Sequence, residues 1–357
     1  MTASLCPFAK IFCKGCTFLK NSGRNKTEMK QGKLPENVLK RSVFKQLHTK
    51  RKDVLLSAGV GEDCAAFTLK EDEVAVLSTD PVIWENSLDG RYAVHANLND
   101  LATSGAEPIG LMLTAMLPAD IEEAQIREMV KTIAAECEPL QVQILGGHTE
   151  ITDAVNRPII SVTAVGKTKK EQILSTSGAK PGDDIVITKW IGLEGTAKLA
   201  HARREELLSR YPAHLIDEAE AFEQYFSVIP EAATAMKSGV RAMHDVTTGG
   251  IFGALWELAE ASGVGLDITL KKIPIRQETV EICEFFDINP YQIASGGSLL
   301  MAAEDGNRLV MDLAKEGIPA VVVGKATAGN DRVLNNEEER RFLEPPRAGL
   351  QVSDLHI

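Results

Sequence analysis

The sequence predicts an α/β or α+β protein with two domains. The chain has 357 residues, patterns typical of strands and helices alternate along most of it, and the turn-forming stretch GAKPG at 178–182 divides it. With 44% hydrophobic and 25% charged residues, the composition is that of an ordinary globular protein. We therefore expect an N-terminal domain at 29–170 and a C-terminal domain at 178–335. A disordered extension at 1–28 and a loose polar tail at 336–357 would flank them.

The predicted elements of the first half come from hydrophobic periodicity and from turn and cap residues. A carboxylate that ends a buried strand, as Asp80 does here, points into the crevice where α/β proteins bind ligands. Gly105 and Pro108 together mark a sharp helix end. The expected order is helix 34–47, strand 74–78, helix 90–105, strand 111–117, a helix that begins near 120–123 and contains Cys137, strand 142–145 running into a Gly-Gly turn, and strand 159–165.

The second half shows the same alternation, and its strand at 240–243 is expected to end at His244 and Asp245. The expected order is strand 184–188, helices 193–209, 213–226 and 230–237, strand 240–243, helix 250–261, strand 266–270, helix 275–285, strand 298–302, helix 308–316 and strand 320–323. The polar residues after Gly329 are expected to be loose.

Charge and hydropathy limit the classes of partner. Residues 1–52 hold 13 Lys and Arg against 2 acids, so the net charge of -11 hides an acidic body. An acidic body argues against nucleic-acid binding, although the basic arm could touch an anionic partner or be simply solvated. No stretch approaches the roughly 18 consecutive apolar residues of a membrane helix, so no membrane partner is expected.

Six cysteines form no disulfide framework, and their use suits a reduced cytoplasmic setting. The apolar stretch at 5–18 is interrupted by charged residues and a proline, which argues against a signal peptide. Cys6, Cys13 and Cys16 could bind metal or do redox chemistry, or belong to a disordered extension. Cys64 and Cys137 are both expected to pack in the core.

Six short signatures, rich in acids or glycine, carry the predicted chemistry. Carboxylate oxygens suit Mg²⁺, and glycines let backbone N–H groups approach phosphate. The signatures are GVGEDCAA at 59–66, STD at 78–80, NLND at 97–100, GGHTE at 146–150, HDVTTGG at 244–250 and SGGSLL at 295–300.

Each signature alone also has an ordinary structural interpretation. Asn97 and Asp100 could lie on the wet face of an amphipathic helix, and Thr248 could be a simple N-cap. His148 and His244 could act as general bases or only as hydrogen-bonding residues. No Walker A sequence, Rossmann glycine pattern, His-Glu-x-x-His or Gly-x-Ser-x-Gly occurs in the chain.

In this order and spacing, the six signatures resemble the superfamily of AIR synthase (phosphoribosylformylglycinamidine cyclo-ligase). Its members include thiamine-monophosphate kinase, selenophosphate synthetase and the hydrogenase-maturation protein HypE. The resemblance runs from about residue 32 to about residue 328. The stretches NLNDLATSGAEP at 97–108 and LTAMLP at 113–118 are most similar to HypE and HypE-like proteins.

The resemblance implies an N-terminal domain whose strands pair across a homodimer into a β-barrel, and a C-terminal α/β domain. It also implies ATP and Mg²⁺ bound in a cleft between the domains. Carried over by motif, the metal ligands would be Asp63, Asp80 and Asp100, and the candidates for catalysis are His148, Glu150 and His244. The residues that would line the nucleotide are Gly61, Glu62, Asn97, Gly146, Gly147, Thr149, Asp245, Thr248, Gly249 and Gly250.

The implied reaction is ATP-dependent activation of an amide-type oxygen, or direct transfer of phosphate, on a small or protein-bound acceptor. A maturation partner protein is compatible with this chemistry. His148 stands where many relatives have an acid, so one metal could be lost or Glu150 could replace that acid. HypE ends in a cysteine that carries the carbamoyl group, whereas this sequence has no cysteine after Cys283, so we expect a different acceptor. The alternatives are a nucleotide-binding assembly factor without turnover and a thiamine-monophosphate kinase-like enzyme.

Overall fold

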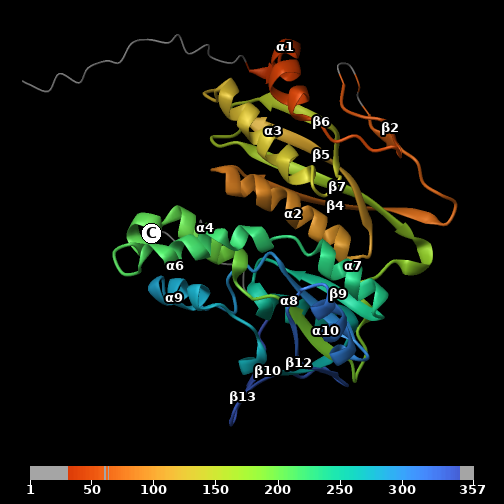
Figure 1. Cartoon of the computed structure of the whole chain (residues 1–357), viewed down its shortest axis with the longest axis vertical. Helices are drawn as coiled ribbons and strands as arrows, with labels where there is room; N and C mark the ends of the chain where they lie inside the picture. Colours follow the sequence, from red (N-terminus) through yellow and green to blue (C-terminus); the bar gives the residue numbers. More distant parts are fainter. Residues whose placement is uncertain (1–30, 60–61, 63, 346–357) are drawn as a thin grey trace, which may run out of the picture.

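The computed structural model describes residues 31–59, 62 and 64–345, and it shows two stacked halves, each built on a β-sheet (Figure 1). Within these residues the strands form a five-stranded sheet, a seven-stranded sheet and a two-stranded ribbon. The predicted mixed α/β fold is confirmed. Both sheets are open in the single chain, so the barrel expected from pairing of two chains remains a prediction.

The five-stranded sheet belongs to the first half and has the strand order β1-β6-β5-β7-β4. Strands β5 and β6 run parallel, and the other neighbours are antiparallel. The strands are β1 (Gly32–Lys33), β4 (Glu73–Ile83), β5 (Glu107–Leu117), β6 (Gln143–Ile151) and β7 (Ile159–Lys169).

Helices α2 (Ser87–Thr103) and α3 (Glu123–Cys137) cover one face of this sheet, and a shared apolar core lies between them and the strands (Figure 1). Asn86 caps α2 and forms a capping box with Asp89, which explains why the helix begins there. The predicted helix at 34–47 consists of three helical turns in sequence: α1 (Glu36–Val38), η1 (Leu39–Val43) and η2 (Phe44–Gln46).

All four predicted strands of the first half extend beyond a predicted end. Strand β4 runs through Asp80 and Pro81, because all eleven of its residues pair with β7. A proline is compatible with this position since β4 is an edge strand. Strand β5 already includes Pro108, and β6 runs through the whole Gly-Gly stretch. The expected turn at Gly-Gly was therefore wrong, because parallel pairing with β5 carries β6 on to Ile151.

The seven-stranded sheet forms the second half, in the order β14-β13-β10-β12-β8-β11-β9. Its strands are β8 (Asp184–Thr188), β9 (Val240–Val246), β10 (Gly265–Thr269), β11 (Ser298–Ala303), β12 (Ala320–Thr327), β13 (Arg332–Asn336) and β14 (Glu339–Phe342). Strand β9 continues past the predicted end at Met243, because His244 and Asp245 pair with β11.

The expectation of a loose tail after Gly329 was also wrong. Strand β13 pairs with β10, and β14 then folds back on β13. Val333, Leu334 and Leu343 are buried, so short apolar residues within a polar stretch anchor this hairpin. Residues 346–357 lie outside the described part of the chain.

Helices pack on both faces of the second sheet, and a further group of helices lies beside it (Figure 1). On the sheet are α7 (Ile229–Lys237), α8 (Gly250–Ser262) and α10 (Gly306–Lys315). The lateral group contains α4 (Leu193–Ala202), α5 (Arg204–Leu207), α6 (Ala213–Glu220), η5 (Ala221–Tyr225) and α9 (Gln277–Phe285). The short 3-10 turns are η3 (Lys170–Gln172), η4 (Thr176–Gly178) and η6 (Leu270–Lys272).

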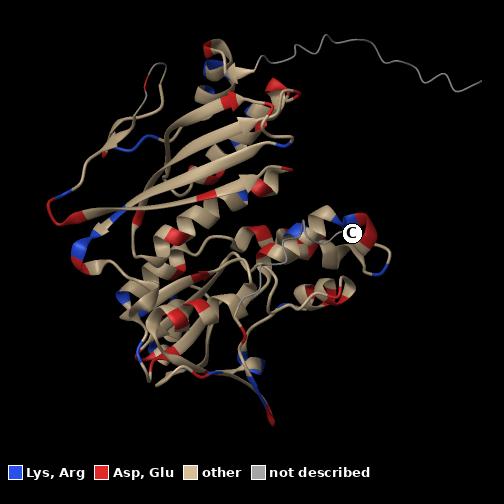
Figure 2. Cartoon of the chain, turned by 180° about the vertical axis from the view of Figure 1, so that it is seen from behind, with Lys and Arg blue, Asp and Glu red and all other residues tan. Residues whose placement is uncertain are grey.

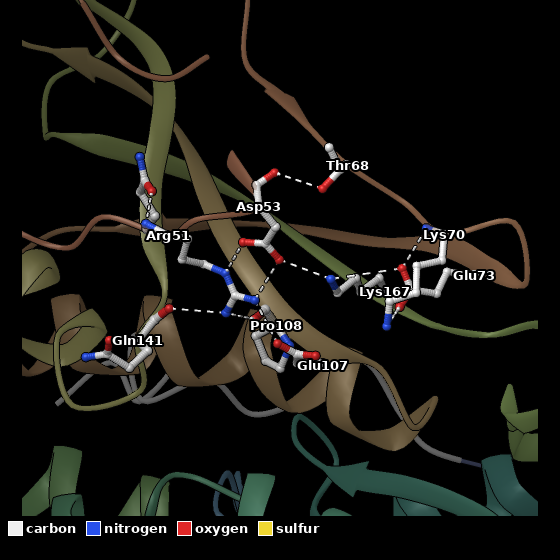
Figure 3. A network of polar contacts seen from close by, with 10 residues as sticks. Arg51, Asp53, Thr68, Lys70, Glu73, Glu107, Pro108, Gln141 and Lys167 are labelled. Carbon is white, nitrogen blue, oxygen red and sulfur yellow. Dashed lines mark hydrogen bonds and ion pairs between the residues drawn. The ribbon is translucent and has the colours of Figure 1, made fainter. Parts of the chain in front are cut away.

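The described residues of the first signature lie between β2 (Val54–Leu56) and the start of β3 (Ala66–Phe67), which pair as a two-stranded ribbon. A polar network ties the start of this ribbon to the five-stranded sheet (Figure 3). Arg51 makes two hydrogen bonds of 2.9 Å to Asp53 and a 2.7 Å ion pair with Glu107 of β5. Lys167 of β7 lies 3.0 Å from Asp53, and the hydrogen bond from Arg51 holds the pKa of Asp53 well below its usual value.

Two of the cysteine predictions have outcomes in this structure. Cys137 is buried in the first core, as expected, and burial raises the pKa of its thiol to about 12. Cys64 is exposed beside the ribbon rather than in the core, because a two-stranded ribbon has no layer to cover it. Cys6, Cys13 and Cys16 lie outside the described residues.

Charged residues of both signs are dispersed over the two halves in the part of the chain described here (Figure 2). In the same part, none of the helices has the length and apolar character that crossing a bilayer requires.

Candidate functional site

A cluster of acids gathers where the two halves meet, and we call Asp80, Asp100 and Asp245 the acid cluster. Asp80 lies on β4, Asp100 in the last turns of α2 and Asp245 on β9. They are far apart in sequence but close enough in space for each charge to affect the others. The negative charges of Asp100 and Asp80 both act on Asp245, and that of Asp80 acts on Asp100.

Hydrogen bonds fix the first two acids against each other. The Ser78 hydroxyl lies 2.5 Å from Asp100 Oδ2, and the backbone N–H of Asp80 donates to Asn97 Oδ1 at 3.1 Å. Asn97 is fully buried, and its amide nitrogen donates to the Ala93 carbonyl. Asn97 and Asp100 of α2 therefore face the middle of β4 rather than solvent, so Asn97 is not on a wet amphipathic face.

Burial and mutual repulsion disfavour the charged forms of Asp100 and Asp245 in the acid cluster. Burial raises the pKa of Asp245 to about 7, and the charge of Asp100 adds to that rise. Burial also raises the pKa of Asp100, with a further contribution from Asp80. Asp245 is 6% exposed, and its Oδ2 is buried without a hydrogen-bond partner among the described residues. A buried, unpaired carboxylate oxygen beside other acids is costly unless a cation compensates it.

The donor set of the acid cluster fits a hard divalent cation, which prefers carboxylate oxygens and keeps part of its water. Among the described residues, however, no three His, Cys, Asp or Glu side chains are already arranged as a complete metal site. Asp63 and Gly61 lie outside the described residues, and Glu62 between them is exposed. The described acids of the cluster therefore form no closed cage of three ligands.

His244 is the histidine that lies at the acid cluster. Its Nε2 is 2.8 Å from Glu257 Oε2 of α8. Burial alone would lower the pKa of His244, but the hydrogen bond with Glu257 and the charges of Asp245 and Asp100 raise it above the usual value. His244 and Asp245 point to opposite faces of β9, and the imidazole turns toward α8, but a proton on His244 still interacts with the charges of Asp245 and Asp100.

His148 and Glu150 lie on the opposite face of the five-stranded sheet from the acid cluster. Successive residues of a strand point to opposite faces, and the pairing registers align His148 with Thr114, Ser161 and Pro81 on the face without helices. His148 Nε2 is 3.3 Å from Glu150 Oε2, and both side chains are about half exposed. Within one chain, the structure does not bring His148 and His244 together.

The two predicted glycine pairs differ in their structural role. Gly147 lies inside β6 with φ +143, and a Cβ there would be 1.9 Å from the Leu113 carbonyl oxygen, so packing against β5 requires it. Thr149 in the same strand accepts a backbone hydrogen bond from Leu34. Gly249 and Gly250 adopt left-handed φ values of 87 and 61 at the start of α8.

The segment from Asp245 to Gly250 therefore leads from the acid cluster to a helix N-terminus. Gly249 is the N-cap residue, and no side chain caps the helix, so Thr248 is not an ordinary N-cap. In the first turn of α8 the Gly250 N–H donates to the Thr247 carbonyl and the Phe252 N–H donates to the Tyr291 carbonyl, so part of this turn is already bonded. The N-terminus of a helix nevertheless favours anions such as phosphate.

Sequence reasoning missed Tyr92 and Glu194 as neighbours of the acid cluster. The charge of Glu194, burial, and the charges of Asp245 and Asp80 raise the pKa of Tyr92 far above its usual value. Glu194 itself accepts hydrogen bonds from Lys198 at 2.7 Å and from the Gly296 N–H at 3.2 Å. Gly296 of the sixth signature therefore contacts α4. The sequence signal that could have identified Glu194 is a glutamate in the first turn of a helix that follows a glycine.

Comparison with known families gives two matches that together cover most of the chain. The profile of the AIR synthase related protein N-terminal domain matches residues 61–168, and that of the C-terminal domain matches residues 180–335.

Known relatives cover nearly the whole chain. A putative hydrogenase expression/formation protein of Methanocaldococcus jannaschii is 28% identical over 329 residues, which are 88% of this chain and 94% of the relative. A carbamoyl dehydratase HypE of Rhodobacter capsulatus is 29% identical over 293 residues, which are 80% of this chain and 83% of the relative. The crystal structure of a hydrogenase maturation protein HypE in complex with ATP has a TM-score of 0.73 at 19% identity and covers 88% of this chain and 95% of that chain.

Proposed function

Because this chain belongs to the AIR synthase related protein family, we propose that it is an ATP- and Mg²⁺-dependent enzyme similar to the HypE proteins of hydrogenase maturation. Its reaction would activate an amide-type oxygen of an acceptor, or transfer phosphate to it. The observation that carries the proposal is the acid cluster between the halves, where Asp245 Oδ2 is buried and unpaired.

The proposed metal ligands are Asp80 and Asp100, with Asp63 as a third. Bound Mg²⁺ would neutralise phosphate charge and orient the nucleotide. Asp245 would face the ion directly or through its water. Burial beside the other acids raises the pKa of Asp245, and the charge of a bound cation would counteract that rise. Asn97 and Ser78 would hold Asp80 and Asp100 in place through the hydrogen bonds described above.

The proposed nucleotide contacts follow the segment that leaves the cluster. Thr248, Gly249 and Gly250 begin α8, where backbone N–H groups favour a phosphate. Glu62, which is exposed, and Gly61, which lies outside the described residues, are further proposed nucleotide contacts. His244, held by Glu257, would keep a proton next to the reacting phosphate and could pass it to or from the acceptor.

We also propose that two copies of the chain pair through the uncovered face of the five-stranded sheet. This face exposes three large apolar side chains: Leu77 at 63%, Ile83 at 45% and Met116 at 37%. Gly146, Gly147, Thr149, His148 and Glu150 lie in β6 of the same sheet. In such a dimer His148 and Glu150 would meet the second copy, which is how they could reach a nucleotide site.

The proposal is tested by incubating the full chain with Mg-ATP and candidate amide, thiocarbamate and thiamine-monophosphate acceptors, and identifying ADP or AMP. Turnover should fall on the order of 10²-fold in Asp100→Asn, because a ligand charge is removed while the shape is kept. Asp120→Asn, at an exposed turn, is the matched control and should behave like the wild type.

Two results would contradict the proposal. Unchanged turnover in Asp100→Asn would remove the acid cluster from the site. ATP binding without turnover for any acceptor would favour the alternative of an assembly factor that uses nucleotide only as a ligand.

A further inference from the structure

A pocket lies in the C-terminal half, and none of its lining residues belongs to the acid cluster. It has a volume of about 690 Å³. The residues that line it follow the end of β8, belong to η5 and α7, or lie at the end of α10. Its lining residues include Lys189, Trp190, Tyr225, Glu231 and Ala314, and none belongs to the six signatures. The volume is within the range of about 300–1,000 Å³ typical of small-molecule sites.

One side of this pocket is aromatic. The rings of Trp190 and Tyr225 meet edge to face, with their centroids 5.3 Å apart. The Arg276 guanidinium lies 5.0 Å from the Trp190 ring and holds it from outside the pocket. Pro230, Ile318 and Pro319 supply further apolar surface. Such walls suit a flat ring, because aromatic faces and edges both offer favourable contacts to it.

The polar part of the pocket is a buried ion pair. Lys189 Nζ is 2.6 Å from Glu231 Oε1, and it also donates to the carbonyls of Tyr225 at 2.8 Å and Ser227 at 2.7 Å. The three donors of this ammonium group are therefore all used. Glu231 remains half satisfied, because its Oε2 is buried without a partner in the described structure. Such an oxygen costs about 1–3 kcal/mol, so an N–H donor is the group that this wall lacks.

Lys189, which supplies the ammonium group of this ion pair, has a strained backbone conformation. Its φ is 52, in the left-handed region that a lysine rarely adopts. The strained conformation follows β8 directly, and the Lys189 N–H donates to the Pro319 carbonyl at 2.7 Å. Strain of this kind costs on the order of 1 kcal/mol and is concentrated at ligand sites.

We propose that this pocket is a binding site for a small molecule with a flat ring and an N–H donor group, such as an amidine, amide or amine. The ring packs against Trp190 and Tyr225, and the N–H group donates to Glu231 Oε2. None of the lining residues is among those assigned to the proposed ATP site, and the test does not depend on any activity.

Benzamidine is a suitable probe, because it combines one ring with amidinium N–H donors, and benzoate offers the same ring with acceptors only. Calorimetric titration of the full chain should give saturable benzamidine binding with a Kd on the order of 1 mM, as expected for nine non-hydrogen atoms. Benzoate should bind at least tenfold more weakly.

Variants at the pocket test whether benzamidine binds there. Glu231→Gln should weaken benzamidine binding about tenfold, because it removes the charge that accepts the donor. Ala314→Trp, at an exposed position of α10 that lines the pocket, should abolish binding without disturbing the core. Met311→Trp is the matched control, since Met311 is exposed on the same helix but does not line the pocket.

The proposal is overturned if benzamidine binding does not saturate, if benzoate binds equally well, or if Ala314→Trp binds like the wild type. The Ala314 variant decides the question even if loss of the buried charge in Glu231→Gln impairs folding.

Discussion

The two faces of the five-stranded sheet differ in what covers them and in what they carry. The face toward α2 holds Ser78 and Asp80 within reach of Asp100. The other face carries Leu77, Thr79 and Ile83 on the same strand, and no helix of the described chain packs on it (Figure 1). Ser78, Thr79 and Asp80 are neighbours in one short signature, yet the side chain of Thr79 lies on the opposite face from the other two. The difference shows that a signature marks a strand, whereas the pleat decides which of its residues reach the site.

The largest effect is expected from Gly147→Ala, which should destabilise the fold by about 3 kcal/mol or more. The new Cβ would be 1.9 Å from the Leu113 carbonyl oxygen, and the φ of +143 is unfavourable for alanine. Gly146→Ala is the matched control, because its Cβ would meet only Met112 Cε at 4.0 Å, and it should change stability by less than about 1 kcal/mol. Urea unfolding measures both, and equal effects would contradict a packing role confined to Gly147.

The second prediction concerns pH and the acid cluster in the absence of divalent cations. The pKa of Asp245 rises from 3.8 to about 7 on folding, so the folded state holds a proton that the unfolded state releases. Stability should therefore fall as the pH rises from about 4 to about 7, by at most about 1.4 kcal/mol per pH unit for this group. Asp100 acts with the same sign, and so does His244 above 6.5, because their pKa values are also raised.

Thermal unfolding at pH 5, 6 and 7.5 measures this dependence. Asp245→Asn should flatten the profile, because the amide does not titrate, and Mg²⁺ should stabilise the wild type more at pH 7.5 than at pH 5. A profile that is unchanged in Asp245→Asn would show that other groups set the pH dependence.

The third prediction concerns the uncovered face. Leu77→Glu should weaken self-association at least tenfold by sedimentation, because a charge replaces an apolar contact, while stability of the single chain should change little at 63% exposure. Met311→Glu, a similarly exposed apolar residue on α10, should leave association unchanged. A wild-type chain that sediments as a monomer at all concentrations would remove the proposed pairing.

The smallest expected effect is the difference in turnover between variants of His244 and His148. His244→Ala should lower nucleotide turnover about tenfold or more, because it removes the proton held beside Asp245. His148→Ala should change turnover within about threefold, since His148 is half exposed on the other face of the single chain and its hydrogen bond there is with Glu150. If His148→Ala has the larger effect, the second copy places it in the site.

Much of the fold followed from local patterns. The strand at 184–188 matches β8 residue for residue, and the helices at 90–105 and 250–261 differ from α2 and α8 by at most three residues at an end. The failures lie where pairing overrides local signals. Asp80, Gly146 and Gly147 were expected to end strands, but neighbouring strands hold the backbone through them. The hairpin of β13 and β14 was missed because only a few apolar residues anchor it.

The sequence by itself determined the order of acids and glycines, the family to which the chain belongs and the mixed α/β class, because these depend on residue types and their spacing. The tertiary structure alone decided that Asp80, Asp100 and Asp245 come together while His148 lies on the other side of the sheet. It also placed Lys189 and Glu231 in a pocket that no motif indicates. The physical reason is that strand pleat, register and helix packing bring together residues more than 100 positions apart, and no short stretch of sequence encodes such a contact.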